Sequence, residues 1–367
     1  MNAAGAFLRS NKVGVDAIGD YPDRIDARSP SEFTLDHVPG ACNHPVLDDA
    51  ERARIGTLHV QVSAFVARKA GAAVVARNIA AMLETAFADQ PKDWAPLVYC
   101  WRGGKRSGAL AHILNEIGWR AVQLDGGYRS YRRHVVAQLT VLPAAFRYEV
   151  VCGLTGSGKS RLLAALAAEG AQVLDLEALA RHRGSLLGDL PGEPQPSQKW
   201  FESQLLEALQ RFDPARPVYV ESESRRIGSV QLPDAMLDAL RAASCIVLKT
   251  PDALRVAMLK DQYAHFLADH ALLTARLSGL LQVQGRKTLD RWAAAAAAGD
   301  WETVVAELLV HHYDPMYTRS MANNFPNVGA AIVGAPADVS EEAFRALARE
   351  IDAAVGLRPA ARAAAAA

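Results

Sequence analysis

Short apolar runs alternate with helix-like stretches in the first third of the chain. Strands that alternate with helices are typical of a parallel α/β sheet. The strand-like runs lie at 24–28, 96–100 and 121–124, and the helix-like stretches at 64–87 and 128–139. We therefore predict a first α/β domain over residues 1–140.

A second series of apolar runs begins at 147–152, after a short irregular piece at 141–145. Further strand-like runs lie at 171–174, 217–220, 245–248 and 330–333, each separated from the next by helical material. This rhythm predicts a second parallel sheet, in a domain over 146–358. The tail at 359–367 is low-complexity alanine, and we expect it to lie outside the folded domain.

The pattern between 251 and 312 is helical throughout. Apolar side chains recur there at roughly helical spacing, at Leu254, Met258, Phe266, Leu272, Leu277 and Leu281. We therefore predict an all-helical insertion within the second domain.

Composition narrows the class of protein. The chain has 367 residues, half of them apolar, which is enough for two domains with cores of their own. Its 40 basic residues balance its 40 acidic ones, so a nucleic-acid surface would have to be a local patch. The four cysteines lie far apart without a CxxC pair, which argues against a disulfide framework and a zinc site. With no apolar leader and no membrane-length apolar run, we expect a cytoplasmic protein with no membrane partner. The sequence does not indicate the oligomeric state.

A phosphate-binding loop follows the strand at 147–152. The stretch GLTGSGKS matches GxxxxGK[ST] and leads into a helix closed by Gly170, which is the context this motif requires. Its backbone N–H groups and lysine would cradle a di- or triphosphate, which Mg²⁺ could accompany. The alternative is a glycine turn that merely joins strand to helix. The expected phosphate-binding residues are Gly153, Thr155, Gly156, Ser157, Gly158, Lys159 and Ser160.

Polar residues near this loop are weaker candidates. Asp175 ends one predicted strand and Glu221 follows another, where a base or metal-associated carboxylate often lies. Either could instead be a solvated or helix-capping carboxylate. Arg225 and Arg226 could clamp an anion bidentately, or form surface ion pairs with neighbouring glutamates.

A cysteine opens a second glycine-containing loop, at the end of the strand at 96–100. In CWRGGKRS, Cys100 is followed by Arg102, Lys105 and Arg106, and a helix begins shortly after. The loop amides, the three cations and the helix dipole favour a thiolate that reacts with an electrophile bearing anionic oxygens. The alternative is a buried structural thiol at a strand end.

The residues around this cysteine resemble the rhodanese domains, which carry sulfur as a cysteine persulfide. The resemblance rests on IDARSPSEF at 25–33, HVPGA at 37–41 and LDGGY at 124–128. It implies that Cys100 is the carrier. The Cys-x5-Arg loop is one residue longer than usual in sulfur-transferring rhodaneses and equals that of the related dual-specificity phosphatases. Such a loop could fit a tetrahedral oxyanion such as phosphate or selenophosphate.

A rhodanese-like domain fused to a P-loop NTPase-like α/β domain with a helical insertion resembles the tRNA 2-selenouridine synthase family. Five strings carry this resemblance: YCWRGGKRS at 99–107, DLEALARHRGS at 175–185, QPSQKWFE at 195–202, ESESRRIG at 221–228 and HYDPMY at 312–317. They add four substrate-binding candidates, Glu177, His182, Arg183 and Lys199.

The resemblance implies a two-step replacement at C2 of the wobble 2-thiouridine of tRNA. In the first step the thiocarbonyl sulfur takes a geranyl group from geranyl diphosphate held by the P-loop. In the second, selenium from selenophosphate displaces geranyl thiol, with Cys100 positioning or carrying the donor. These two compounds would be cosubstrates, and no tightly bound cofactor or metal site is implied.

Two sequence features bear on the partners of such an enzyme. The helical region at 251–312 could form an apolar pocket for the geranyl chain, although leucines at helical spacing are more often ordinary core. The helix near 128–139 is locally basic, with Arg129, Arg132 and Arg133 interleaved with Tyr128 and Tyr131. This mixture could bind tRNA, or simply be a solvated helix face.

Two other functions remain open on the residues alone. Each loop by itself would also allow a Cys-x5-Arg phosphatase fused to a P-loop kinase. An inactive rhodanese that serves as a tRNA-binding module is the non-enzymatic alternative.

Overall fold

A computed structural model of the chain describes residues 11–357, so the alanine tail predicted at 359–367 lies outside the described residues. The chain forms two compact units. The first runs to Gln138 and includes Ser197–Glu207, and the second comprises Leu139–Pro196 and the chain from Ala208 onward.

The segment Ser197–Glu207 is a departure from the predicted domain over 146–358. It packs with the first unit because the ring of Trp200 stacks on His37, with centroids 4.0 Å apart. Ser203 also donates a 2.8 Å hydrogen bond to the buried carboxylate of Asp36. No hydrophobic periodicity indicated that Ser197–Glu207 would pack with the first unit.

The first unit is built on a five-stranded parallel sheet in the order β1-β5-β4-β2-β3. Three of its strands coincide with predicted apolar runs. The strands are β1 (Lys12–Val13), β2 (Arg24–Asp26), β3 (Ala41–Asn43), β4 (Leu97–Tyr99) and β5 (Val122–Leu124). The central strand β4 is buried at every position and leads directly into Cys100, which places the cysteine at the carboxyl edge of the sheet.

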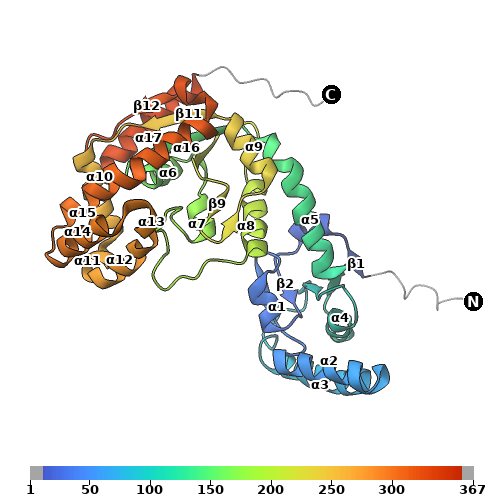
Figure 1. Ribbon diagram of the computed structural model, residues 1–367. Coiled ribbons are helices and arrows are strands. Elements are labelled where there is room, and N and C mark those ends of the chain that lie inside the picture. The colour runs from blue at the N-terminus through green and yellow to red at the C-terminus, as the bar shows by residue number, and fades with distance from the viewer. Residues whose placement is uncertain (1–10, 358–367) are drawn as a thin grey trace, which may run out of the picture. The chain divides into compact units, whose positions relative to one another are not determined.

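Helices surround this sheet (Figure 1). They are η1 (Val15–Asp20), α1 (Pro30–Leu35), α2 (Asp49–Gln61), α3 (Ala64–Glu84), α4 (Lys105–Ile117), α5 (Gly127–Val141) and α8 (Gln198–Gln210), the last two extending past the bounds of the unit. Asp26 and Arg28 form a buried ion pair at 2.6 Å. The IDAR run therefore lies in the interior of the first unit, at the carboxyl end of β2.

The second unit contains a five-stranded parallel sheet in the order β12-β11-β6-β8-β7 and a separate β9–β10 hairpin. The strands are β6 (Tyr148–Gly153), β7 (Gln172–Leu174), β8 (Val218–Glu221), β9 (Arg226–Ile227), β10 (Val230–Gln231), β11 (Ser244–Leu248) and β12 (Ile332–Gly334). The central strand is again the one that feeds a glycine loop, β6.

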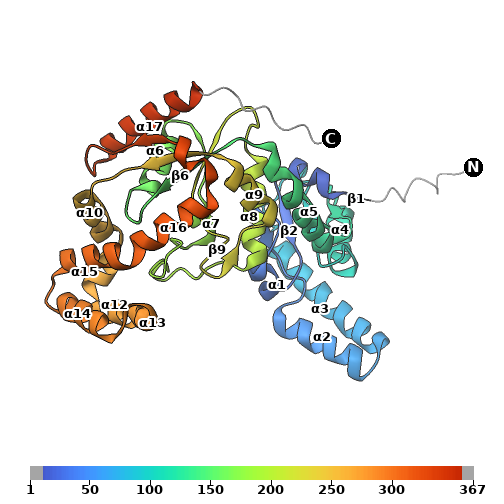
Figure 2. The same ribbon diagram turned by 45° about the horizontal axis from the view of Figure 1, so that its top comes forward.

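Helices α6 and α17 pack against each other beside this sheet (Figures 1 and 2). Leu162 and Leu166 from α6 share a core with Leu347 and Ile351 from α17. The helices before the insertion are η2 (Leu142–Ala145), α6 (Lys159–Ala168), α7 (Leu176–Ala180) and α9 (Asp234–Ala242), and those after it are α16 (Asp314–Asn324), η5 (Pro326–Ala330) and α17 (Glu341–Gly356).

The predicted helical region is present, with a core of its own. It contains α10 (Asp252–Gln262), α11 (Ala264–Ala268), α12 (His270–Leu277), η3 (Ser278–Leu280), α13 (Leu281–Gln284), α14 (Arg286–Ala297), α15 (Trp301–Leu308) and the π-helix η4 (Leu309–Tyr313). Two of the apolar residues that indicated these helices do not face the core. Leu272 and Leu281 are exposed, and the neighbouring Leu273 and Leu280 turn inward instead.

The predicted fold class is confirmed: two parallel α/β sheets, the second with a helical insertion. None of the helices within residues 11–357 is both long and apolar enough to cross a bilayer.

Candidate active site

The P-loop joins β6 to α6 in a conformation that glycine must supply. Gly158 has φ +89°, and a Cβ there would lie 2.5 Å from Cζ of Phe344. The loop is also held from outside, because Thr250 donates a 2.7 Å hydrogen bond to the carbonyl of Ser157 and Arg255 donates one of 3.0 Å to that of Thr155. These contacts fix the loop around the N-terminus of α6, an arrangement suited to anions.

A cavity of about 350 Å³ opens on this loop. The ammonium of Lys159 donates to the carbonyl of Gly153 at 3.2 Å and lies 5.4 Å from the ring centre of Tyr317. Every loop residue from Thr155 to Ser160 lines the cavity, together with Arg161, Glu177, Arg183, Ser185, Tyr263 and Tyr317 among others. The structure thus brings two of the predicted substrate-binding candidates, Glu177 and Arg183, to the phosphate loop.

Carboxyl groups gather beside Lys159. Ser160 donates a 3.2 Å hydrogen bond to Glu177, and the backbone N–H of Glu177 donates to Glu221 at 2.7 Å. Burial, and then the negative charge of Glu223, raise the pKa of Glu177 to about 7. Burial and the charges of its carboxylate neighbours raise the pKa of Glu221 well above its usual range. Protons on these groups would lessen their repulsion of a bound diphosphate.

The remaining candidates lie outside this cavity. Asp175 caps α7 by accepting a hydrogen bond from Ala178, as the capping alternative expected. Arg225 pairs with Asp234, and Arg226 donates to the carbonyl of Gly228 in its own hairpin, so the structure favours the ion-pair alternative for the first and a turn contact for the second.

His182 and Lys199 are also placed elsewhere. His182 is buried, its Nδ1 accepts a hydrogen bond from the backbone of Gly184, and burial lowers its pKa. An unprotonated Nδ1 facing a backbone donor indicates a structural role. Lys199 lies in the segment that packs with the first unit, where its carbonyl accepts a hydrogen bond from Arg132.

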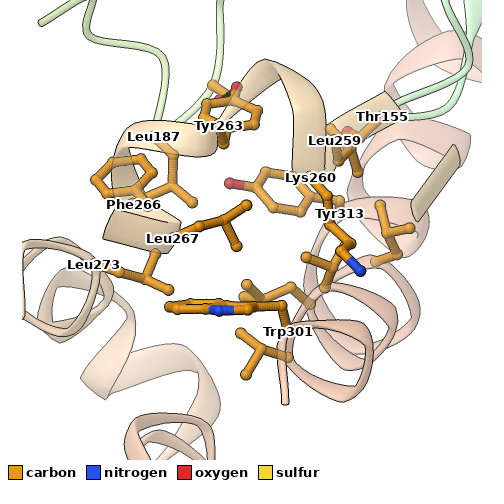
Figure 3. A pocket seen from close by; sticks show the side chains of 15 residues that line it. Thr155, Leu187, Leu259, Lys260, Tyr263, Phe266, Leu267, Leu273, Trp301 and Tyr313 are labelled. Carbon is orange, nitrogen blue, oxygen red and sulfur yellow. Dashed lines mark hydrogen bonds between the residues drawn. The ribbon is translucent and has the colours of Figure 1, made fainter. Parts of the chain in front are cut away.

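A second, apolar pocket of about 60 Å³ adjoins the P-loop cavity. Figure 3 shows Tyr263 and Trp301 on opposite sides of it, with Phe266 and Leu273 along one edge. Four residues line both spaces: Thr155, Ser185, Leu259 and Tyr263. The cavity at the P-loop and the apolar pocket therefore share a wall, an arrangement that could hold a molecule with a charged head and a hydrocarbon tail.

Sequence reasoning missed several residues of this site. Tyr263, Trp301 and Tyr317 line the two spaces and follow the P-loop by more than 100 residues, Tyr263 between α10 and α11 and the other two in α15 and α16. Tyr317 lies within the HYDPMY string, but the string alone assigned it no role. Tyr263 and Trp301 carried no signal beyond apolar helical spacing.

The cysteine loop lies in the first unit, at the carboxyl end of β4. Cys100 is buried, and the hydroxyl of Ser107 donates a 3.2 Å hydrogen bond to its sulfur. The loop packs closely against the turn at 126–127: the backbone N–H of Tyr128 donates to the carbonyl of Cys100 at 2.8 Å. Gly127 has φ +58°, and a Cβ there would lie 2.2 Å from that same carbonyl oxygen, so no other residue fits.

The three predicted cations of this loop differ in environment. Arg106 donates a 2.8 Å hydrogen bond to Glu32, and although burial opposes it, this contact with Arg106 lowers the pKa of Glu32. Arg102 and Lys105 are exposed and form no ion pair with any residue in 11–357. Arg106 is therefore paired with the carboxylate of Glu32, whereas Arg102 and Lys105 could bind an anion. Among residues 11–357 no His, Cys, Asp and Glu group of three or more is arranged to hold a metal ion.

Comparisons with known proteins find similarity in both units. The family model described as "Rhodanese-like domain" matches residues 15–134, and that described as "tRNA 2-selenouridine synthase AAA domain" matches residues 146–286. Curated relatives named tRNA 2-selenouridine synthase come from Nitrosomonas europaea, 34% identical over 79% of this chain and 80% of the relative, and from Aeromonas salmonicida, 34% identical over 82% and 87%. A third, from Alcanivorax borkumensis, is 33% identical over 80% and 88%.

The matches span both domains in a single relative, which neither a phosphatase–kinase fusion nor an isolated rhodanese module would explain. With a P-loop cavity in one unit, a cysteine loop in the other and this similarity along most of its length, the chain belongs to the tRNA 2-selenouridine synthase family of enzymes.

Proposed function

We propose that this enzyme converts the wobble 2-thiouridine of tRNA into 2-selenouridine through S-geranyl-2-thiouridine. Its cosubstrates would be geranyl diphosphate and selenophosphate. The names of the curated relatives support tRNA as the substrate and 2-selenouridine as the product. The geranyl step rests on the residues of the second unit.

The observation that carries the proposal is the shared wall between the two spaces of the second unit. Geranyl diphosphate has a multiply charged diphosphate head and a ten-carbon apolar tail. The P-loop, with Lys159, suits the head, and the pocket between Tyr263 and Trp301 suits the tail. The carbon that reacts, where head meets tail, would then lie near the residues that line both spaces.

The first step is a substitution at that carbon. The thiocarbonyl sulfur forms a bond to C1 of the geranyl group, the C1–O bond breaks, and its electron pair leaves with diphosphate. The base loses its N3 proton and gains a C2–N3 double bond. Lys159 and the backbone N–H groups of the P-loop stabilise the charge that develops on the leaving oxygen.

The second step uses the cysteine loop. Selenium from selenophosphate adds to C2, the C2–S bond breaks to release geranyl thiol, and cleavage of the Se–P bond by water releases phosphate. Arg102 and Lys105 offer charge to the anionic donor, and the thiol of Cys100 would position the selenophosphate so that its selenium faces C2 of the base. Alkylation in the first step makes this possible, because it turns a poor sulfur leaving group into a better one.

The test is mass spectrometry of nucleosides from a 2-thiouridine tRNA treated with the purified enzyme, with each cosubstrate omitted in turn. We expect S-geranyl-2-thiouridine with geranyl diphosphate alone and 2-selenouridine when selenophosphate is added. Formation of 2-selenouridine with no geranyl diphosphate present would contradict the two-step scheme.

A further inference from the structure

Trp101, the residue directly after Cys100, is 36% exposed. Its ring lies 5.3 Å from that of Tyr128, tilted by 33°, so one side of the indole is supported by the protein. Its carbonyl accepts a 3.0 Å hydrogen bond from the backbone of Arg129, which fixes the loop beneath it. A supported, partly exposed indole beside a reactive thiol is a platform on which a flat ring could stack.

The aromatic residues that the sequence offered for this role are not available. Tyr128 is 2% exposed and Tyr131 is 5% exposed. The hydroxyl of Tyr128 donates a 2.6 Å hydrogen bond to Asp36, and the guanidinium of Arg28 lies 3.9 Å from the centre of its ring. Both tyrosines therefore belong to the core, and Trp101 takes their place at the surface.

Four exposed cations belong to the loop that carries the indole and to the first turns of the adjoining helix α5. Arg102 and Lys105 belong to the same loop, Arg129 is bonded through its backbone to Trp101, and Arg133 follows one helical turn later in α5. Within the described chain none of the four is paired with a carboxylate, and the nearby Asp125 is engaged by Lys12 at 3.6 Å. Unpaired cations together with an exposed aromatic ring are the electrostatic and stacking elements of a single-stranded nucleic-acid site.

We propose that Trp101 stacks on the modified wobble base while Arg102, Lys105, Arg129 and Arg133 contact the phosphates of the anticodon loop. The proposal rests on the proposed function for the identity of the RNA. It adds a nucleobase subsite in the first unit, directly beside Cys100, where the base would be held for the exchange of geranyl thiol for selenium. Because Trp101 directly follows Cys100, C2 of the stacked base would lie close to the thiol.

Binding of RNA by the full-length enzyme tests the stacking, with no cosubstrate present. The probe is an anticodon stem-loop carrying S-geranyl-2-thiouridine at the wobble position, and the measurement is its Kd. We expect Trp101→Ala to weaken binding roughly 5- to 150-fold, the range expected for the loss of one base-stacking contact. Trp101→Phe should stay within about threefold of the wild type, and so should Phe65→Ala, a control at an exposed aromatic residue of the same unit.

The salt dependence of the same Kd tests the cations. Arg129→Ala should lower the slope of log Kd against log salt concentration by about one phosphate contact, whereas Lys69→Ala, on the exposed surface of α3, should not. Selenation of the pre-geranylated stem-loop is then followed for each variant. Trp101→Ala should raise the KM for RNA more than it lowers kcat, which a mere loss of loop structure would not do.

Failure of this proposal can be told apart from failure of the proposed function. If the wild type neither binds the stem-loop nor selenates it, the proposed function is wrong. If the wild type does both and Trp101→Ala binds within threefold of it, the stacking proposal is overturned. Normal RNA binding with lost self-association in Trp101→Ala would also overturn it, by making the indole a protein-docking surface.

Discussion

The hydroxyl of Ser107 donates a 3.2 Å hydrogen bond to the sulfur of Cys100, linking the first turn of α4 to the thiol at the end of β4. Gln123 in turn donates a 2.9 Å hydrogen bond to that hydroxyl. The thiol is therefore held by a short chain of side chains, and its reactivity should depend on that chain.

Ser107→Ala removes this contact with little change in volume. A hydrogen bond of this kind contributes about 0.5–1.5 kcal/mol, so selenation of pre-geranylated tRNA should slow by roughly 3- to 10-fold. Geranylation by the same preparation is the internal control, because it uses the other unit. Slowing of both reactions alike would mean a general loss of folded enzyme.

Lys159→Ala should block the first step. The ammonium is the point charge of the P-loop, and loss of such a group from a developing oxyanion costs roughly 10²–10³ in rate. Single-turnover formation of S-geranyl-2-thiouridine is the measurement, and Lys287→Ala, an exposed position in α14, is the matched control. Accumulation of geranylated tRNA at the wild-type rate in Lys159→Ala would refute the assignment of the diphosphate to the P-loop.

Trp301→Ala should change the preferred length of the isoprenoid. The indole forms one side of the apolar pocket, so its removal leaves room for further carbons, each buried CH₂ being worth about 0.8 kcal/mol. We expect kcat/KM for farnesyl diphosphate relative to geranyl diphosphate to rise about 10-fold. An unchanged ratio in a variant that is folded would place the tail elsewhere.

Binding of geranyl diphosphate should weaken as pH rises through 7. With its pKa raised to about 7 by burial and by Glu223, Glu177 is neutral below that pH and charged above it, and the charged form repels a diphosphate. Glu177→Gln keeps an acceptor for Ser160 and removes the titration. It should therefore bind more tightly than the wild type at pH 8 and equally at pH 6, in calorimetry without added Mg²⁺. The ligand itself also ionises in this range, but it does so equally with both proteins, so the difference between them reports on Glu177. The control for the loss of one charge is Glu350→Gln, at an exposed position of α17.

Contiguous motifs made the two loops predictable. The eight residues from Gly153 to Ser160 specify a backbone conformation by themselves, and an apolar run before Cys100 placed it at a strand end. In parallel sheets a loop after a central strand opens at the carboxyl edge, where ligands bind. Fold class and loop positions therefore followed from local pattern.

The walls of the sites could not be predicted in this way, because hydropathy indicates burial but not direction. Leu272 and Leu273 are equally apolar, yet only Leu273 turns into the core of the helical region. Tyr128 and Tyr131 resembled a nucleic-acid surface until the fold placed them against buried groups, among them Asp36. Which side chains meet depends on segments that are distant in the sequence.

The central claim is that the second unit performs geranylation and the cysteine loop of the first unit performs selenation. Its most direct test is one reaction of Cys100→Ser with 2-thiouridine tRNA, geranyl diphosphate and selenophosphate together. The 2-thiouridine, S-geranyl-2-thiouridine and 2-selenouridine nucleosides are then quantified. Serine preserves the size of the side chain but removes the large, polarisable sulfur that would position the selenium donor. The account predicts that S-geranyl-2-thiouridine forms at the wild-type rate and accumulates, with no 2-selenouridine. Formation of 2-selenouridine at the wild-type rate, or absence of the geranylated nucleoside, would contradict it.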